Sequence, residues 1–126
     1  MKKFPALSIM VAILLGVAAP ASIAADATIR SMANMIMHLN HYPSDHEKAR
    51  LAAIAADEHV SAGERTLAGA LMRMQHAVEG DDAAALRALA ADGHASEDER
   101  ELADILLGIH HHASPGDQQR LQALLN

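Results

Sequence analysis

The sequence of 126 residues contains no cysteine and no tryptophan, and it has only one phenylalanine and one tyrosine. Without cysteine the chain forms no disulfide bonds, so helix packing and helix capping must hold the fold together. Without large aromatic side chains, the core must be filled by alanine, leucine, isoleucine and methionine. These small and flexible side chains let helices approach closely, so the composition favours an all-α fold over a sheet.

The N-terminal segment has the order of a secretory signal peptide. A basic pair, a charge-free apolar run and a tail of small residues follow one another at positions 2–3, 6–19 and 21–25. An apolar run of about 14 residues is shorter than the roughly 20 that span a bilayer. We therefore expect residues 1–24 to be a signal peptide cleaved after Ala24, and residues 25–126 to be a periplasmic or secreted protein with no membrane anchor.

The charge of the mature chain excludes some partners. Of the 10 lysines and arginines, Lys2 and Lys3 leave with the signal peptide, and the remaining 8 stand against 16 acidic residues. The net charge is then −8 with histidine neutral. Such a surface repels nucleic acid and offers no basic patch to anionic lipids, so we expect neither nucleic acid nor membrane as a partner.

A repeat of 35 residues organises the mature chain. The segment Glu-Arg-Thr-Leu-Ala at 64–68 recurs as Glu-Arg-Glu-Leu-Ala at 99–103, and the same offset relates His41, His76 and His111. The sequence therefore predicts one domain over 25–126, made of three units near 27–60, 61–95 and 96–126.

Each unit has the pattern of two helices. Apolar residues at helical spacing, with serine caps before them and proline or glycine stops after them, predict helices over 27–41, 44–57, 61–77, 81–92, 96–111 and 115–125. The expected caps are Ser44, Ser61, Ser96 and Ser114, and the expected stops are Pro43, Gly80 and Gly93. Expected connections of two to four residues predict three helical hairpins, forming either a short α-solenoid-like array or a compact six-helix bundle. In an open array the terminal units lack a neighbour, so a homodimer is an alternative.

Two acidic turns carry a resemblance to a known family. The segment 92–99, Asp-Gly-His-Ala-Ser-Glu-Asp-Glu, and its echo at 57–64 resemble the helix-to-helix turn of TerB-like tellurite-resistance domains. Those domains are all-helical and are implicated in metal-ion binding and stress. The resemblance implies that Asp57, Asp92 and Glu99 meet a cation.

All nine histidines lie in the mature chain, and several recur in register. Imidazole is a common metal ligand, so we expect candidate copper, zinc or nickel ligands at His38, His41, His59, His76, His94 and His111. Methionine thioethers near these positions would add affinity for Cu(I), although Met32 and Met74 occupy slots filled by leucine or isoleucine in other units and so fit a core. An alternative is that His41, His76 and His111 lie in the last turn of a helix and bond its free carbonyl groups. Another is that protonation of the histidines makes the protein respond to acid.

No catalytic constellation is present in the sequence. Four of the five mature serines are expected helix caps, and no Ser-His-Asp set or glycine-rich phosphate loop occurs. We therefore expect a non-enzymatic, exported helical-repeat protein that binds a protein partner or assembles with itself. The alternatives are a periplasmic metal-binding or metal-buffering protein that uses the repeated histidines, and an acid- or metal-stress-response protein.

Overall fold

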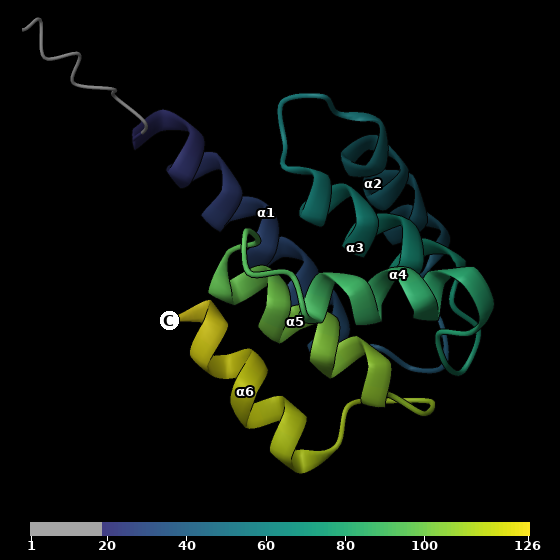
Figure 1. Ribbon diagram of the computed structural model, residues 1–126. Helices are drawn as coiled ribbons and strands as arrows, with labels where there is room; N and C mark the ends of the chain where they lie inside the picture. The colour runs from purple at the N-terminus through teal and green to yellow at the C-terminus, as the bar shows by residue number, and fades with distance from the viewer. Residues whose placement is uncertain (1–18) are drawn as a thin grey trace, which may run out of the picture.

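The structure is a computed structural model that describes residues 19–126, with side chains from Ala27 onward. The described chain is all-helical, as the sequence predicts, and it forms a compact bundle (Figure 1). Its helices are α1 (Ala19–Met37), α2 (Asp45–Ala56), α3 (Ala62–Arg73), α4 (Gly80–Ala90), α5 (Glu97–Gly108) and α6 (Pro115–Leu125).

The first helix of each unit ends earlier than the sequence predicts. Helices α1, α3 and α5 end at Met37, Arg73 and Gly108, whereas the expected ends were residues 41, 77 and 111. The expected connections of two to four residues were therefore also too short, because residues 38–44 join α1 to α2. The predicted stop at Gly80 was wrong, because this residue begins α4 with a positive φ of 61°. The apolar periodicity continues beyond the helix ends because the turns also place side chains in the core.

Serine caps begin four of the helices, as predicted. The side chains of Ser44, Ser61, Ser96 and Ser114 each accept a hydrogen bond from the backbone N–H three residues later. The full reciprocal capping box is present at Ser44, where the side chain of Glu47 also accepts from the Ser44 N–H. The corresponding glutamate of α5, Glu99, instead lies buried and accepts a hydrogen bond of 2.9 Å from the Ser61 hydroxyl. Glu47 thus completes the cap at the start of α2. Glu99 instead joins α5 to Ser61, the cap residue of α3.

The helices close into a ring of units. The most extensive helix contacts join the second helix of one unit to the first helix of the next, in the pairs α2 with α3 and α4 with α5. The contact of α6 with α1 completes the cycle, and α1, α3 and α5 also contact one another. Of the two architectures expected, the structure is therefore the compact bundle, and no unit stands at an open end.

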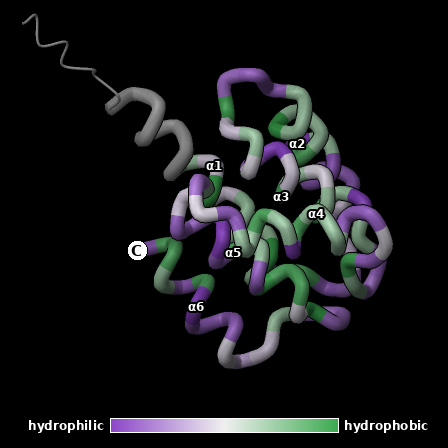
Figure 2. The backbone as a smooth tube through the Cα atoms, in the orientation of Figure 1, coloured by the Kyte–Doolittle hydropathy of each residue, from purple (hydrophilic) through white to green (hydrophobic). Residues whose placement is uncertain are grey.

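The core is aliphatic and contains the methionines. Met32, Met35 and Met74 are buried, and the methionines at 37 and 72 pack against the core from partly buried positions. The interpretation of these methionines as packing residues is confirmed. In Figure 2 the first part of α6 is mostly hydrophilic and its C-terminal part mostly hydrophobic. Leu121 is buried in this part of the helix, and Leu124 and Leu125 pack against the core.

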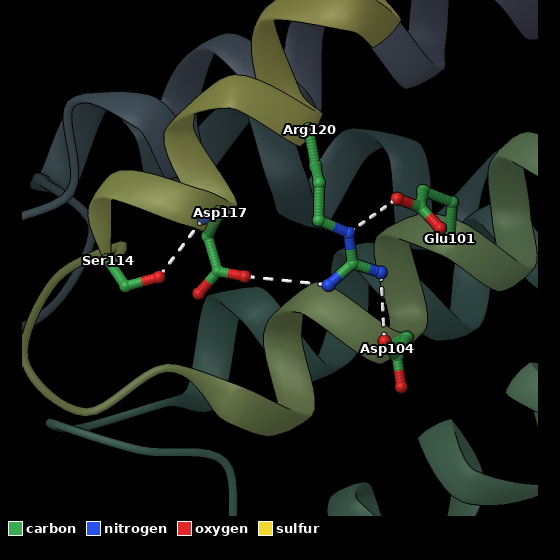
Figure 3. Close-up of polar contacts among 5 residues, drawn as sticks. All are labelled: Glu101, Asp104, Ser114, Asp117 and Arg120. Atoms are coloured by element: carbon green, nitrogen blue, oxygen red, sulfur yellow. Dashed lines mark hydrogen bonds and ion pairs between the residues drawn. The ribbon is translucent and has the colours of Figure 1, made fainter.

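An arginine on α6 ties this helix to α5. The guanidinium of Arg120 contacts Glu101 at 2.6 Å, Asp104 at 2.8 Å and Asp117 at 3.5 Å (Figure 3). Hydrogen bonds to Glu101 and Asp104 raise the pKa of Arg120 above its usual value. Asp117 also donates its backbone N–H to the Ser114 side chain, so the start of α6 and its contact with α5 share one polar cluster.

The predicted signal peptide falls mainly outside the described part of the chain. Residues 1–18 are not described, and for residues 19–24 only the helical backbone of α1 is. Cleavage after Ala24 therefore stays a prediction. Within residues 19–126, no helix is long and apolar enough to cross a membrane.

Candidate metal centre

The three repeated histidines lie in tight turns after α1, α3 and α5. His41, His76 and His111 have φ angles of 72°, 70° and 72°, a region that non-glycine residues seldom adopt. In each turn the N–H of the following residue donates to the carbonyl of the preceding one, as from Tyr42 to Asn40 at 2.9 Å. A three-residue turn with this hydrogen bond and a positive central φ is a strained γ-turn. The alternative interpretation, histidines in the last turn of a helix, was wrong.

A ring of backbone hydrogen bonds joins the three turns. The N–H of His41 donates to the carbonyl of His111 at 2.7 Å, the N–H of His76 to His41 at 2.9 Å, and the N–H of His111 to His76 at 2.6 Å. The γ-turn leaves these groups available because its own hydrogen bond uses the flanking residues. The turns gather at the end of the bundle at the lower right of Figure 1. The backbone hydrogen bonds that join the three turns therefore also bring the three histidines together.

The imidazole rings converge through their Nδ1 atoms. His111 Nδ1 lies 3.0 Å from His41 Nδ1 and 3.1 Å from His76 Nδ1. The ring centroids are 4.9, 5.0 and 5.1 Å apart, so the rings form a nearly equilateral triangle. The triad therefore has approximate threefold symmetry, as the three units of the chain do.

The protonation of the triad follows from these contacts. Each N···N hydrogen bond needs one donor and one acceptor, and one assignment that satisfies both contacts leaves His111 Nδ1 unprotonated, with its single lone pair shared between the Nδ1–H groups of His41 and His76. Desolvation and the nearby imidazoles, His76 first and then His41, lower the pKa of His111 below its usual value. The neutral form of His111 is thus favoured, and neutral imidazole is the form that binds metals.

The spacing of the nitrogens suits one transition-metal ion. An ion about 2.05 Å from each nitrogen, with tetrahedral angles between the bonds, separates the nitrogens by about 3.3 Å. The two separations from His111, 3.0 and 3.1 Å, require an expansion of about 0.3 Å, and all three ligand nitrogens lie within 4.8 Å of one another, a spread that side-chain rotation can adjust. In the part of the chain with described side chains, the triad is the one group of three or more His, Cys, Asp or Glu residues placed to share an ion.

The triad has a buried side and an exposed side. The residues two positions before each histidine, Leu39, Met74 and Ile109, are all buried in the core. The three histidines themselves are exposed. The turns are therefore anchored by residues of the core, and solvent reaches the histidine side chains.

The other histidines predicted as ligands lie apart from the triad. His38 Nδ1 donates to the carbonyl of Asn34 at 2.9 Å, one turn earlier on α1. His59 and His94 lie in the turns before α3 and α5, where their backbone N–H groups donate to Asp57 and Asp92 at 2.8 Å. Among the described residues, none of these three belongs to a group able to share an ion with the triad.

The carboxylates implied by the TerB-like turns have local hydrogen-bond partners. The backbone N–H of His59 lowers the pKa of Asp57, whose oxygen it reaches at 2.8 Å. Asp92 accepts the equivalent bond from His94, and Glu99 accepts from Ser61. These contacts give the three carboxylates hydrogen-bond partners within the protein, and cation binding there stays a prediction.

Sequence reasoning missed the γ-turns and the ring that they form. The sequence signal for the site was the recurrence of histidine at one fixed offset, next to residues that vary between units.

Comparison with known protein families, with curated proteins and with solved structures finds no match. The assignment of this site therefore rests on its geometry.

Proposed function

We propose that the protein binds one transition-metal ion per chain through the Nδ1 atoms of His41, His76 and His111. The observation that carries the proposal is the convergence of these atoms, at 3.0 and 3.1 Å, from turns that are far apart in the sequence. Three strained γ-turns at the same histidines add support, because strained backbone at non-glycine residues is concentrated at functional sites.

The ligand set suits zinc, copper and nickel. Imidazole nitrogen is a good ligand for all three ions, and the Irving–Williams order gives Cu(II) the highest affinity of the three at a given nitrogen site. Metal binding needs all three Nδ1 lone pairs, so the Nδ1 protons of His41 and His76 move to their Nε2 atoms. Because this is a change of tautomer, each ring stays neutral when the ion binds.

Isothermal titration calorimetry of residues 25–126 with Zn(II), Cu(II) and Ni(II) tests the proposal. We expect one saturable site for at least one ion, lost in the variant H41N/H76N/H111N. Asparagine removes the imidazole but tolerates positive φ better than most residues, so this variant keeps the turns.

A matched control removes the same number of histidines elsewhere. The variant H38A/H59A/H94A lacks the other three predicted ligands and should bind the ion with unchanged stoichiometry. Saturable binding that survives in H41N/H76N/H111N and disappears in the control variant would contradict the proposal.

Export is part of the proposed function. The order of basic, apolar and small residues in 1–24 supports delivery to the periplasm or the medium, where the protein would buffer or carry the ion. A role in acid or metal stress fits the same chemistry, because protons compete with metals for imidazole. N-terminal sequencing of the exported protein tests the cleavage, and a start at Ala25 is the expected result.

Binding to a protein partner or to a second copy stays a separate proposal. The argument for a homodimer was that terminal units of an array need neighbours. The contact of α6 with α1 supplies that neighbour within one chain. Light scattering of the metal-free protein distinguishes monomer from dimer, and the protein-binding hypothesis then depends on finding a partner that binds without metal.

A further inference from the structure

The proposed ion has an incomplete set of protein ligands. Zinc takes at least four ligands and nickel or copper take four to six, whereas His41, His76 and His111 supply three. Within the described side chains, no fourth His, Cys, Asp or Glu joins this group. Of the two histidines beside His111 in the sequence, His110 and His112, neither belongs to this group, and His112 has its Nδ1 3.2 Å from the carbonyl of Ala113.

The missing ligands can approach the triad from solvent. The residues two positions before each histidine, Leu39, Met74 and Ile109, are buried in the core, and backbone hydrogen bonds join the three turns. The outer side is exposed at all three histidines. Any further ligand therefore comes from solvent, and three protein ligands with an open fourth position are the arrangement of exchangeable rather than closed structural sites.

The charge of the loaded site selects the chemistry of that ligand. Three neutral imidazoles leave the full charge of a divalent ion uncompensated, in contrast to sites with thiolate or carboxylate ligands. An anion at the open position would neutralise the ion without displacing a protein group.

We propose that the ion held by the triad binds a small anion, such as a carboxylate, as an exchangeable ligand from the solvent side. This inference rests on the proposed function, because the anion binds to the metal and not to the protein. The ligand is recognised by its negative charge and small size. The metal-loaded protein is thus a receptor for small anions, and the metal-free protein is not.

Visible spectroscopy of the Co(II)-loaded protein, residues 25–126, tests this inference. Co(II) substitutes for zinc at imidazole sites, and its visible absorption changes when a ligand is exchanged. Titration with sodium acetate, and separately with sodium azide, should give a saturable change with one anion per ion and half-saturation at about 1–10 mM, a weak binding of about 3–4 kcal/mol. Sodium perchlorate at equal ionic strength, a poorly coordinating anion, should leave the spectrum unchanged.

The outcomes separate this inference from the proposed function. If Co(II) binds stoichiometrically and neither acetate nor azide alters its spectrum, the open position is absent and the inference is wrong, while metal binding stands. If Co(II) does not bind, the proposed function fails first. An equal spectral response in H41N/H76N/H111N would place the anion at another metal site and would also overturn the inference.

Discussion

The Nδ1 atoms of His41 and His111 lie 3.0 Å apart although the residues are separated by 70 positions in the sequence. The contact joins the first unit of the chain to the last. It is accompanied by a backbone hydrogen bond of 2.7 Å between the same two residues and by the packing of α6 against α1. The candidate site therefore forms only when the ring of units closes.

Replacement of His76 by glycine should stabilise the metal-free protein. His76 has a φ of 70°, which glycine adopts without the steric cost that a Cβ atom brings. We expect the free energy of unfolding to rise by about 1 kcal/mol, because the relief of strain exceeds the loss of the imidazole contacts. Urea denaturation measures this change.

The control is His94→Gly, since His94 is not among the residues with positive φ in the described chain. Glycine there relieves no strain and should be neutral or destabilising. A loss of stability in His76→Gly equal to that in His94→Gly would show that the γ-turn carries no strain.

Metal binding should raise the thermal unfolding temperature. A ligand that binds only the folded state stabilises it by about 2.7 kcal/mol at a free concentration 100 times its dissociation constant. For a domain of this size the expected rise is about 10 °C or more. Scanning calorimetry with and without zinc measures it, and a shift of the same size in H41N/H76N/H111N would contradict binding at the triad.

Loss of the Arg120 guanidinium should weaken the contact of α6 with α5 without affecting metal binding. Its contacts reach Glu101 at 2.6 Å and Asp104 at 2.8 Å, but the side chain is 36% exposed, so solvent screens them. We expect Arg120→Ala to lower the free energy of unfolding by about 1 kcal/mol.

The matched control for this prediction is Arg50→Ala, at the equivalent position of the first unit. Arg50 donates to the neutral hydroxyl of Ser31 at 2.9 Å. Its removal should therefore cost less than that of Arg120, and the cost should depend less on salt. Equal costs for both variants at low and high salt would show that the ion pairs of Arg120 add nothing.

The ion pair of Arg73 with Asp82 should make stability depend on pH in the acid range. Arg73 Nε donates to Asp82 at 2.9 Å and Nη2 at 2.6 Å, and these bonds lower the pKa of the Asp82 carboxyl. A carboxyl with a lowered folded-state pKa contributes stability above its unfolded pKa of about 3.9 and loses it as the pH falls through the folded value.

The Asp82→Asn variant isolates this contribution. Because the Arg73 side chain is 57% exposed, we expect a stability difference below about 1 kcal/mol near neutral pH. The difference in the free energy of unfolding between the wild type and Asp82→Asn should shrink towards zero below the folded-state pKa of Asp82. Urea denaturation near neutral pH and at a pH below that pKa measures this difference. A difference that stays constant over this range would contradict the assignment.

Much of the fold could be predicted from local signals. Serine caps at Ser44, Ser61, Ser96 and Ser114 and the spacing of apolar residues gave six helices in the correct order. The helix ends after α1, α3 and α5 could not be predicted, because the γ-turns depend on backbone hydrogen bonds between units. The hydrogen bond from His41 to His111 joins two distant parts of the chain, so a local sequence pattern cannot predict it.

The triad was only partly predictable for the same reason. Recurrence at 35 residues selected His41, His76 and His111 together with His59 and His94, which recur at the same offset. The spacing of neighbouring helices in an array, about 8–10 Å, gave no reason to expect nitrogens at 3.0 Å. Backbone hydrogen bonds join the turns of His41, His76 and His111, and among the described side chains only these three imidazoles come together.

Anomalous X-ray diffraction from crystals grown with zinc tests the central claim most directly. Data collected on either side of the zinc absorption edge locate the ion without reference to the protein. The proposed function predicts one strong peak per chain, about 2.0–2.1 Å from the Nδ1 atoms of His41, His76 and His111. A zinc peak at other histidines, with none at the triad, would contradict it.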